Sequence, residues 1–145
     1  MIRKITIPMH KENGSLVSLS NLLEAIPDNE WRWIIIEFYG IGSPPHGMTM
    51  DEFEESIRNE PNGLTVSWAE LKEMGKNIEQ TYDFLAVAYA PNSPLEVPPT
   101  DTESLNDSLG QCILIRAFDS MEWTVEVSDR LGFSEKLISA IARMK

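Results

Sequence analysis

The segment that most constrains the fold is Trp31–Tyr39, because it is apolar on both of the faces that an extended chain presents. Alternate residues of a strand point to opposite sides. One side would carry Ile34, Ile36 and Phe38, and the other would carry Trp31, Trp33, Ile35, Glu37 and Tyr39. A strand with two apolar faces has to be covered on both, so we expect it near the centre of a sheet.

The rest of the chain alternates between strand and helix patterns. Strands are expected at 2–7, 82–90, 111–118 and 123–127, with a brief pairing at Leu64–Val66, and helices at 18–26, 49–59, 67–75 and 134–144. Strands that follow one another late in the chain favour an α+β fold over a doubly wound sheet. The sequence therefore predicts a single α+β domain over 1–145, whose mostly antiparallel sheet has about four to five strands with helices packed on it.

The charge is strongly negative, at −11, and it is unevenly distributed. Residues 1–36 hold four acids and four bases, and residues 116–145 hold five of each, whereas residues 37–115 hold fourteen acids against three bases. Nucleic-acid and anionic-membrane binding both need positive charge, so neither is expected. An acidic surface attracts basic partners and speeds their capture. Solubility alone would also account for acidity.

Two further features indicate the compartment. A lone cysteine, Cys112, rules out an intrachain disulfide and suits reducing conditions. The first residues lack the apolar run of a signal peptide, and the longest apolar stretches are far too short to span a bilayer. We expect a cytoplasmic protein.

Catalytic, metal-binding and cofactor-binding signatures are not found in the sequence. The two histidines, His10 and His46, stand near no nucleophile elbow, and no His-x-x-His or Cys-x-x-Cys spacing occurs. The Gly40-x-Gly42 pair is not followed by the glycine and helix of a dinucleotide site. No catalytic residue, metal or cofactor is therefore predicted. The enzymatic alternative is a carboxylate pair, Glu37 with Asp83.

Two short segments resemble bacterial immunity proteins, the cytoplasmic antidotes of polymorphic toxin systems. They are Gly63–Leu71, which reads Gly-Leu-Thr-Val-Ser-Trp-Ala-Glu-Leu, and Phe118–Trp123, which reads Phe-Asp-Ser-Met-Glu-Trp. The general character of the chain, small, acidic and poor in cysteine, is similar as well. The resemblance implies a non-enzymatic protein that binds a toxin and presents carboxylates to its basic cleft.

The predicted function is thus capture of a basic protein partner through the acidic middle of the chain, and the resemblance implies that this partner is a toxin. The residues expected to bind the partner are Asp51, Glu52, Glu54, Glu55, Glu60, Glu96, Asp101, Glu103, Asp107 and Trp123. Trp123 is included because tryptophan often anchors interfaces, although a core position is the alternative. A further alternative is a structural module, a homo-oligomer formed by edge pairing of the hairpin that contains Trp123.

Overall fold

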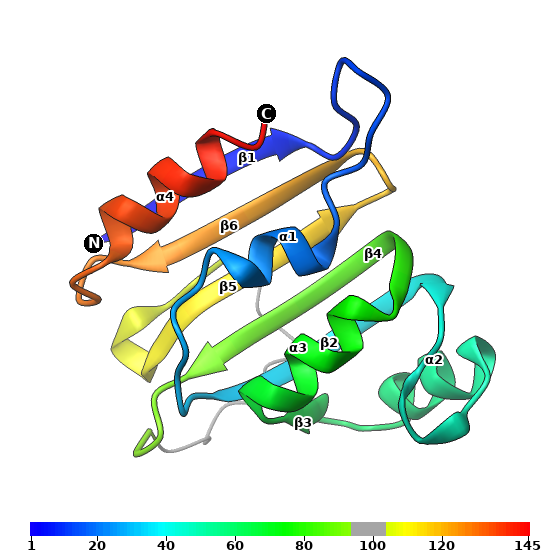
Figure 1. The fold of residues 1–145 in the computed structure, drawn as a ribbon. Coiled ribbons are helices and arrows are strands. Elements are labelled where there is room, and N and C mark those ends of the chain that lie inside the picture. The colour runs from blue at the N-terminus through cyan, green and yellow to red at the C-terminus, as the bar shows by residue number, and fades with distance from the viewer. Residues whose placement is uncertain (94–103) are drawn as a thin grey trace.

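The computed structural model describes residues 1–93 and 104–145, and its main feature is a six-stranded antiparallel sheet in the order β1-β6-β5-β4-β2-β3 (Figure 1). The strands are β1 (Ile2–Pro8), β2 (Arg32–Gly42), β3 (Leu64–Val66), β4 (Ile78–Tyr89), β5 (Gln111–Phe118) and β6 (Glu122–Ser128). The α+β class and the antiparallel sheet are confirmed. The strand count exceeds the expected four to five because β3, only three residues long, is a full member of the sheet.

Four α-helices accompany the sheet in the described part of the chain: α1 (Leu19–Glu24), α2 (Met50–Arg58), α3 (Trp68–Lys76) and α4 (Ser134–Ala142). Ser18, Thr49 and Ser67 begin the first three, each in a capping box with the side chain three residues on. These reciprocal bonds satisfy backbone donors that a helix start would otherwise leave unpaired. Figure 1 shows α1, α3 and α4 lying across one face of the sheet, with α2 at a corner beside the end of β2.

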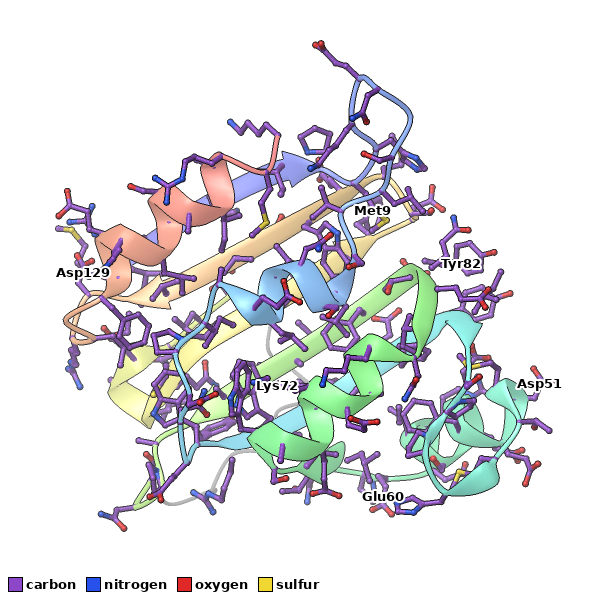
Figure 2. The ribbon with its side chains drawn as sticks, in the orientation of Figure 1. Met9, Asp51, Glu60, Lys72, Tyr82 and Asp129 are labelled. Carbon is purple, nitrogen blue, oxygen red and sulfur yellow. The ribbon has the colours of Figure 1, made fainter. Side chains whose placement is uncertain are left out.

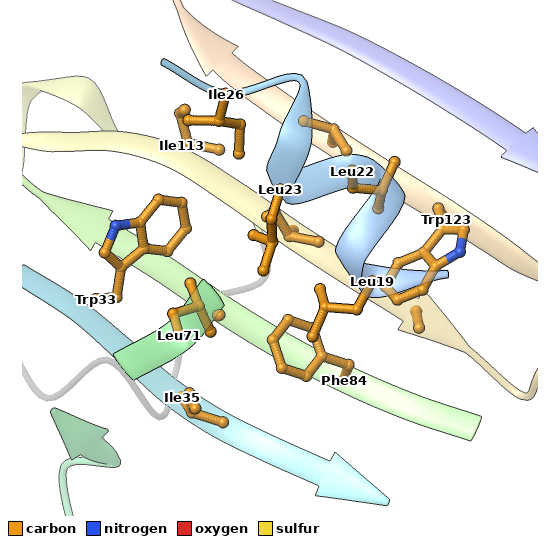
Figure 3. Close-up of a cluster of buried hydrophobic side chains, with 14 of the residues drawn as sticks. Leu19, Leu22, Leu23, Ile26, Trp33, Ile35, Leu71, Phe84, Ile113 and Trp123 are labelled. Atoms are coloured by element: carbon orange, nitrogen blue, oxygen red, sulfur yellow. The ribbon is translucent and has the colours of Figure 1, made fainter. Parts of the chain in front are cut away.

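The main core lies between the helices and the sheet. Its buried side chains come from both layers. Figure 3 shows those of α1, of the segment that follows it, of α3 and of the strands beneath them: Leu19, Leu22, Leu23, Ile26, Trp33, Ile35, Leu71, Phe84, Ile113 and Trp123. Alanines at 86 and 88 leave room on β4 for the helices to approach closely. A smaller cluster on the opposite sheet face joins Ile34, Leu85, Val87, Tyr89, Leu105 and Leu114. The central strands are therefore covered on both faces over part of their length, as the apolar pattern predicts.

A bulge in β2 changes which residues share a face. Ile35 pairs with Ala86, but the next pair is Glu37 with Leu85, so Ile36 is an extra residue. A single inserted residue reverses the alternation of all that follow. Phe38 consequently joins the main core, while Glu37 and Tyr39 are exposed. The expectation that Glu37 and Tyr39 share the face of Trp33 is wrong for this reason.

Candidate functional site

The exposed carboxylates expected to bind a partner gather mainly at one corner of the molecule. Asp51, Glu52 and Glu55 are exposed on α2, and Glu60 is exposed in the turn that follows. Figure 2 shows Asp51 and Glu60 at this corner, far from Asp129 beside α4. The first two acids also lie in the first turn of α2, where they favour the helix through its dipole.

Glu54 does not belong to this exposed set. Its side chain is only 5% exposed, and its Oε2 accepts a hydrogen bond from the buried backbone N–H of Gly40 at 3.1 Å. The two neighbouring acids thus lie on different faces of α2, with Glu54 buried and Glu55 exposed. The expected role of Glu54 in partner binding is corrected to an internal one, fastening α2 to β2.

Asp107 lies elsewhere and is neutralised locally. It follows β4 in the chain but contacts Ser128, the N-terminal ammonium of Met1 at 3.6 Å and Arg130 at 3.9 Å. Burial alone would raise the pKa of Asp107, but the Ser128 hydroxyl and the two positive charges lower it below its ordinary value. The acidic middle of the chain is therefore divided between separate surfaces. Glu96, Asp101 and Glu103 lie outside the described residues.

Trp123 is an interior residue. It is 1% exposed, packs edge-on to Phe84, and donates its indole N–H to the carbonyl of Val17 at 2.8 Å. In addition, β6 is paired on both sides, by β1 and β5, so its hairpin has no open edge for another copy. Both expectations that depended on Trp123, an interface anchor and an edge-pairing hairpin, are corrected.

Beside the acids of α2 lies an open, largely apolar groove of about 500 Å³ between α2, β3 and α3. Phe53 and Met74 line it from the two helices, Leu64 and Val66 line it from β3, and Met48 lines it from the preceding loop. Concave apolar sites of roughly 300–1,000 Å³ are typical of binding pockets. The groove is thus large enough to accept several apolar side chains of a partner or one small molecule.

The rim of the groove is acidic. Glu60, Glu70 and Glu73 line it together with His46, and all four side chains are exposed. The backbone N–H and the hydroxyl of Ser67 hold the pKa of Glu70 below its ordinary value, so this rim charge persists in mild acid. An apolar floor with a carboxylate rim is suited to an apolar side chain that is flanked by cations.

Sequence reasoning missed the groove, although its signal was present. On α3 and at its C-terminal cap the lining residues recur at intervals of three and four: Ala69, Glu70, Glu73, Met74 and Asn77. That spacing marks one helix face. Because this face is a mixture of acids and small apolar residues, it did not stand out as either a core stripe or a charge cluster.

Nearby bases compensate only part of this charge. Between residues 45 and 77 the chain holds seven acids against three bases. Lys72 is directed to Asp28, at 3.4 Å, and stands over the ring of Trp68. Its charge is thereby drawn to the far side of α3 from the α2 acids, so the groove rim stays net negative.

The carboxylate pair of the enzymatic alternative is placed on the opposite sheet face. Glu37 pairs with Leu85, and Asp83 pairs with Tyr39, so the two acids are diagonal neighbours. Glu37 is exposed, whereas Asp83 accepts the backbone N–H of Asp119 at 2.9 Å. That bond gives Asp83 a structural task, holding the turn between β5 and β6.

Within 1–93 and 104–145, no three or more His, Cys, Asp and Glu side chains are grouped so that they could hold a metal ion. Over the same residues, every helix is too short or too polar to cross a bilayer. Comparison with models of protein families, with curated proteins and with solved structures gives no match for this chain.

Proposed function

We propose that this chain is a non-enzymatic cytoplasmic binding protein that captures a basic protein partner at the groove between α2 and α3. The observation that carries the proposal is the apolar groove with carboxylates along its rim and on the adjoining helix. Protein interfaces commonly combine an apolar centre with a polar rim. Here the sign of the rim selects a partner whose apolar anchor is surrounded by Lys or Arg.

An immunity protein acting on a basic toxin is the specific form of this function that we favour. The acidic surface would steer the toxin to the groove and occupy its cationic cleft with carboxylates. The resemblance of Gly63–Leu71 to such antidotes supports this form, because these residues include β3 and the start of α3, which border the groove.

The test is retention of host proteins on the immobilised chain at low and at high salt. A triple variant, Asp51→Asn with Glu52→Gln and Glu55→Gln, removes the exposed charge of α2, and Glu135→Gln on α4 is the matched control. We expect a basic protein to be retained by the wild type and the control, to be lost by the triple variant, and to be released by salt. Retention of no basic protein, or retention that salt and the triple variant leave unchanged, would contradict the proposal.

The toxin form needs a second step. The gene of the retained protein is expressed alone and together with this chain, and growth of the cells is followed. Growth arrest that this chain relieves would support an immunity protein. If cells that express the retained protein alone grow normally, the partner is not a toxin, and the immunity form of the proposal is contradicted.

A further inference from the structure

The face of the sheet opposite the helices carries exposed aromatic side chains at one end. Tyr39 on β2 is 53% exposed and Phe118 on β5 is 60% exposed. Tyr82, at the register shift of β4, adds its ring 5.3 Å from that of Tyr39. Scattered exposed apolar residues are ordinary, but a contiguous group on a surface marks an interaction site.

Strand register arranges this end of the sheet as a row in which aromatic and acidic residues alternate. Tyr39 pairs with Asp83, and Phe118 pairs with Glu122. Because Phe84 pairs with Ala117, Asp83 is opposite Phe118. The row across β2, β4, β5 and β6 is therefore Tyr39, Asp83, Phe118 and Glu122, and we call it the aromatic–acidic row.

The row is rigidly supported. Asp119 and Ser120 have φ values of 49° and 57°, the conformation of a tight hairpin turn. The Asp119 N–H donates to Asp83 at 2.9 Å, the Ser120 N–H donates to the Tyr82 carbonyl at 2.8 Å, and Gln80 donates to the Ser120 hydroxyl at 3.0 Å. The turn after Phe118 is thereby fixed to β4, so little ordering of the turn backbone would be needed on binding.

The chemistry of the row matches a guanidinium group. Arginine stacks on aromatic faces and also makes paired hydrogen bonds to a carboxylate, whereas lysine offers a point charge. Glu37, exposed in the next row, adds to the negative charge, and Arg116 in that row is half-buried. A second copy of this chain would bring like charges together, which disfavours self-association here.

We propose that the aromatic–acidic row is a docking surface for arginine side chains of a basic protein segment. It shares with the proposed function the need for a basic partner, but it uses the opposite sheet face and does not require the groove. The aromatic rings supply the contact area, and Asp83 and Glu122 supply the charge on either side of Phe118.

The experiment titrates the whole chain, labelled with ¹⁵N, with an acetylated Gly-Arg-Gly-Arg-Gly peptide and follows the backbone amide signals. Peptides with lysine or with neutral citrulline in place of arginine are the matched probes. We expect the arginine peptide to shift the signals of 37–39, 82–83 and 117–122, with a weaker effect of lysine and none of citrulline. Equal effects of arginine and lysine, or shifts confined to other residues, would overturn the proposal.

Variants separate this surface from the groove. The double variant Tyr39→Ser with Phe118→Ser should lower the affinity for the arginine peptide about tenfold, because two exposed cation–π contacts are lost. Leu109→Ser, an exposed apolar residue elsewhere, should leave its affinity unchanged, and the dispersed spectrum of each variant reports that it is folded. If the triple variant of α2 abolishes peptide binding while the aromatic variant does not, the row is overturned and the groove proposal stands.

Discussion

Glu54 provides a sharp test because the structure gives it a role that its neighbour Glu55 lacks. Both are acids in the middle of α2, yet Glu54 is buried and bonded to the Gly40 N–H whereas Glu55 is exposed. We predict that Glu54→Ala destabilises the fold, that Glu55→Ala does not, and that Glu54→Gln, which keeps an acceptor, has less than half the effect of alanine.

The magnitude follows from the bond that is lost. Removing the carboxylate leaves the buried Gly40 N–H without its acceptor. Hydrogen bonds to a charged group contribute about 1.5–3 kcal/mol, so we expect the free energy of unfolding to fall by about 2 kcal/mol. For a chain of this length that corresponds to a decrease in Tm of about 4–8 °C. An exposed substitution such as Glu55→Ala should stay within about 0.5 kcal/mol.

Urea unfolding followed by tryptophan fluorescence measures these differences, with Tm from circular dichroism as a second readout. The reasoning would be refuted if Glu54→Ala and Glu55→Ala had equal midpoints, since that would mean that Glu54 does not fasten α2 to β2. Partner retention should show the reverse pattern, because Glu55 is exposed to a partner and Glu54 is not.

Three further predictions concern stability. Trp123→Phe should lower the free energy of unfolding by about 2 kcal/mol or more, because it removes a buried hydrogen bond to Val17 and leaves a cavity. Urea unfolding measures this loss. Gly63→Ala should lower the free energy of unfolding, measured in urea, by more than about 1 kcal/mol, since φ is +81° there and a Cβ would meet β2. Asp28 has its pKa lowered from 3.8, chiefly by the hydrogen bond from Trp68, so it contributes stability above pH 3.8 that is lost as pH falls through the lower folded value. Asp28→Asn should therefore flatten the acid limb of a stability–pH curve, and an unchanged limb would contradict this.

Much of the fold could be read from local patterns. Helix starts were the surest, because Ser67 with Glu70 satisfies backbone donors within one turn, and such bonds need no tertiary information. The class of fold followed from the two-sided apolar pattern of Trp31–Tyr39 and from the late run of strands. Strand β3 was underestimated because three residues give too little alternation to recognise.

The candidate site was less accessible to sequence reasoning. Helical spacing places Glu54 beside the apolar stripe of Met50 and Ile57, but only the packing of α2 against β2 shows that its carboxylate accepts the Gly40 N–H. The bulge at Ile36 moved Tyr39 to an exposed row, and no local residue signals that insertion. Trp123 shows the same limit, because an interface tryptophan and a core tryptophan differ only in what tertiary structure places over them.

The most direct test of the central proposal is to fill the groove and measure affinity for the retained partner. Ala69 is exposed on the α3 wall, so Ala69→Trp would occupy the space without disturbing the core, and Ser139→Trp on α4 is the matched control. Calorimetric titration should show that Ala69→Trp raises the Kd for the partner about tenfold or more, which is the scale of a lost interface anchor. The Kd of the control variant and the Tm of both variants should stay unchanged. Equal Kd values for the wild type and Ala69→Trp would contradict the groove as the binding site.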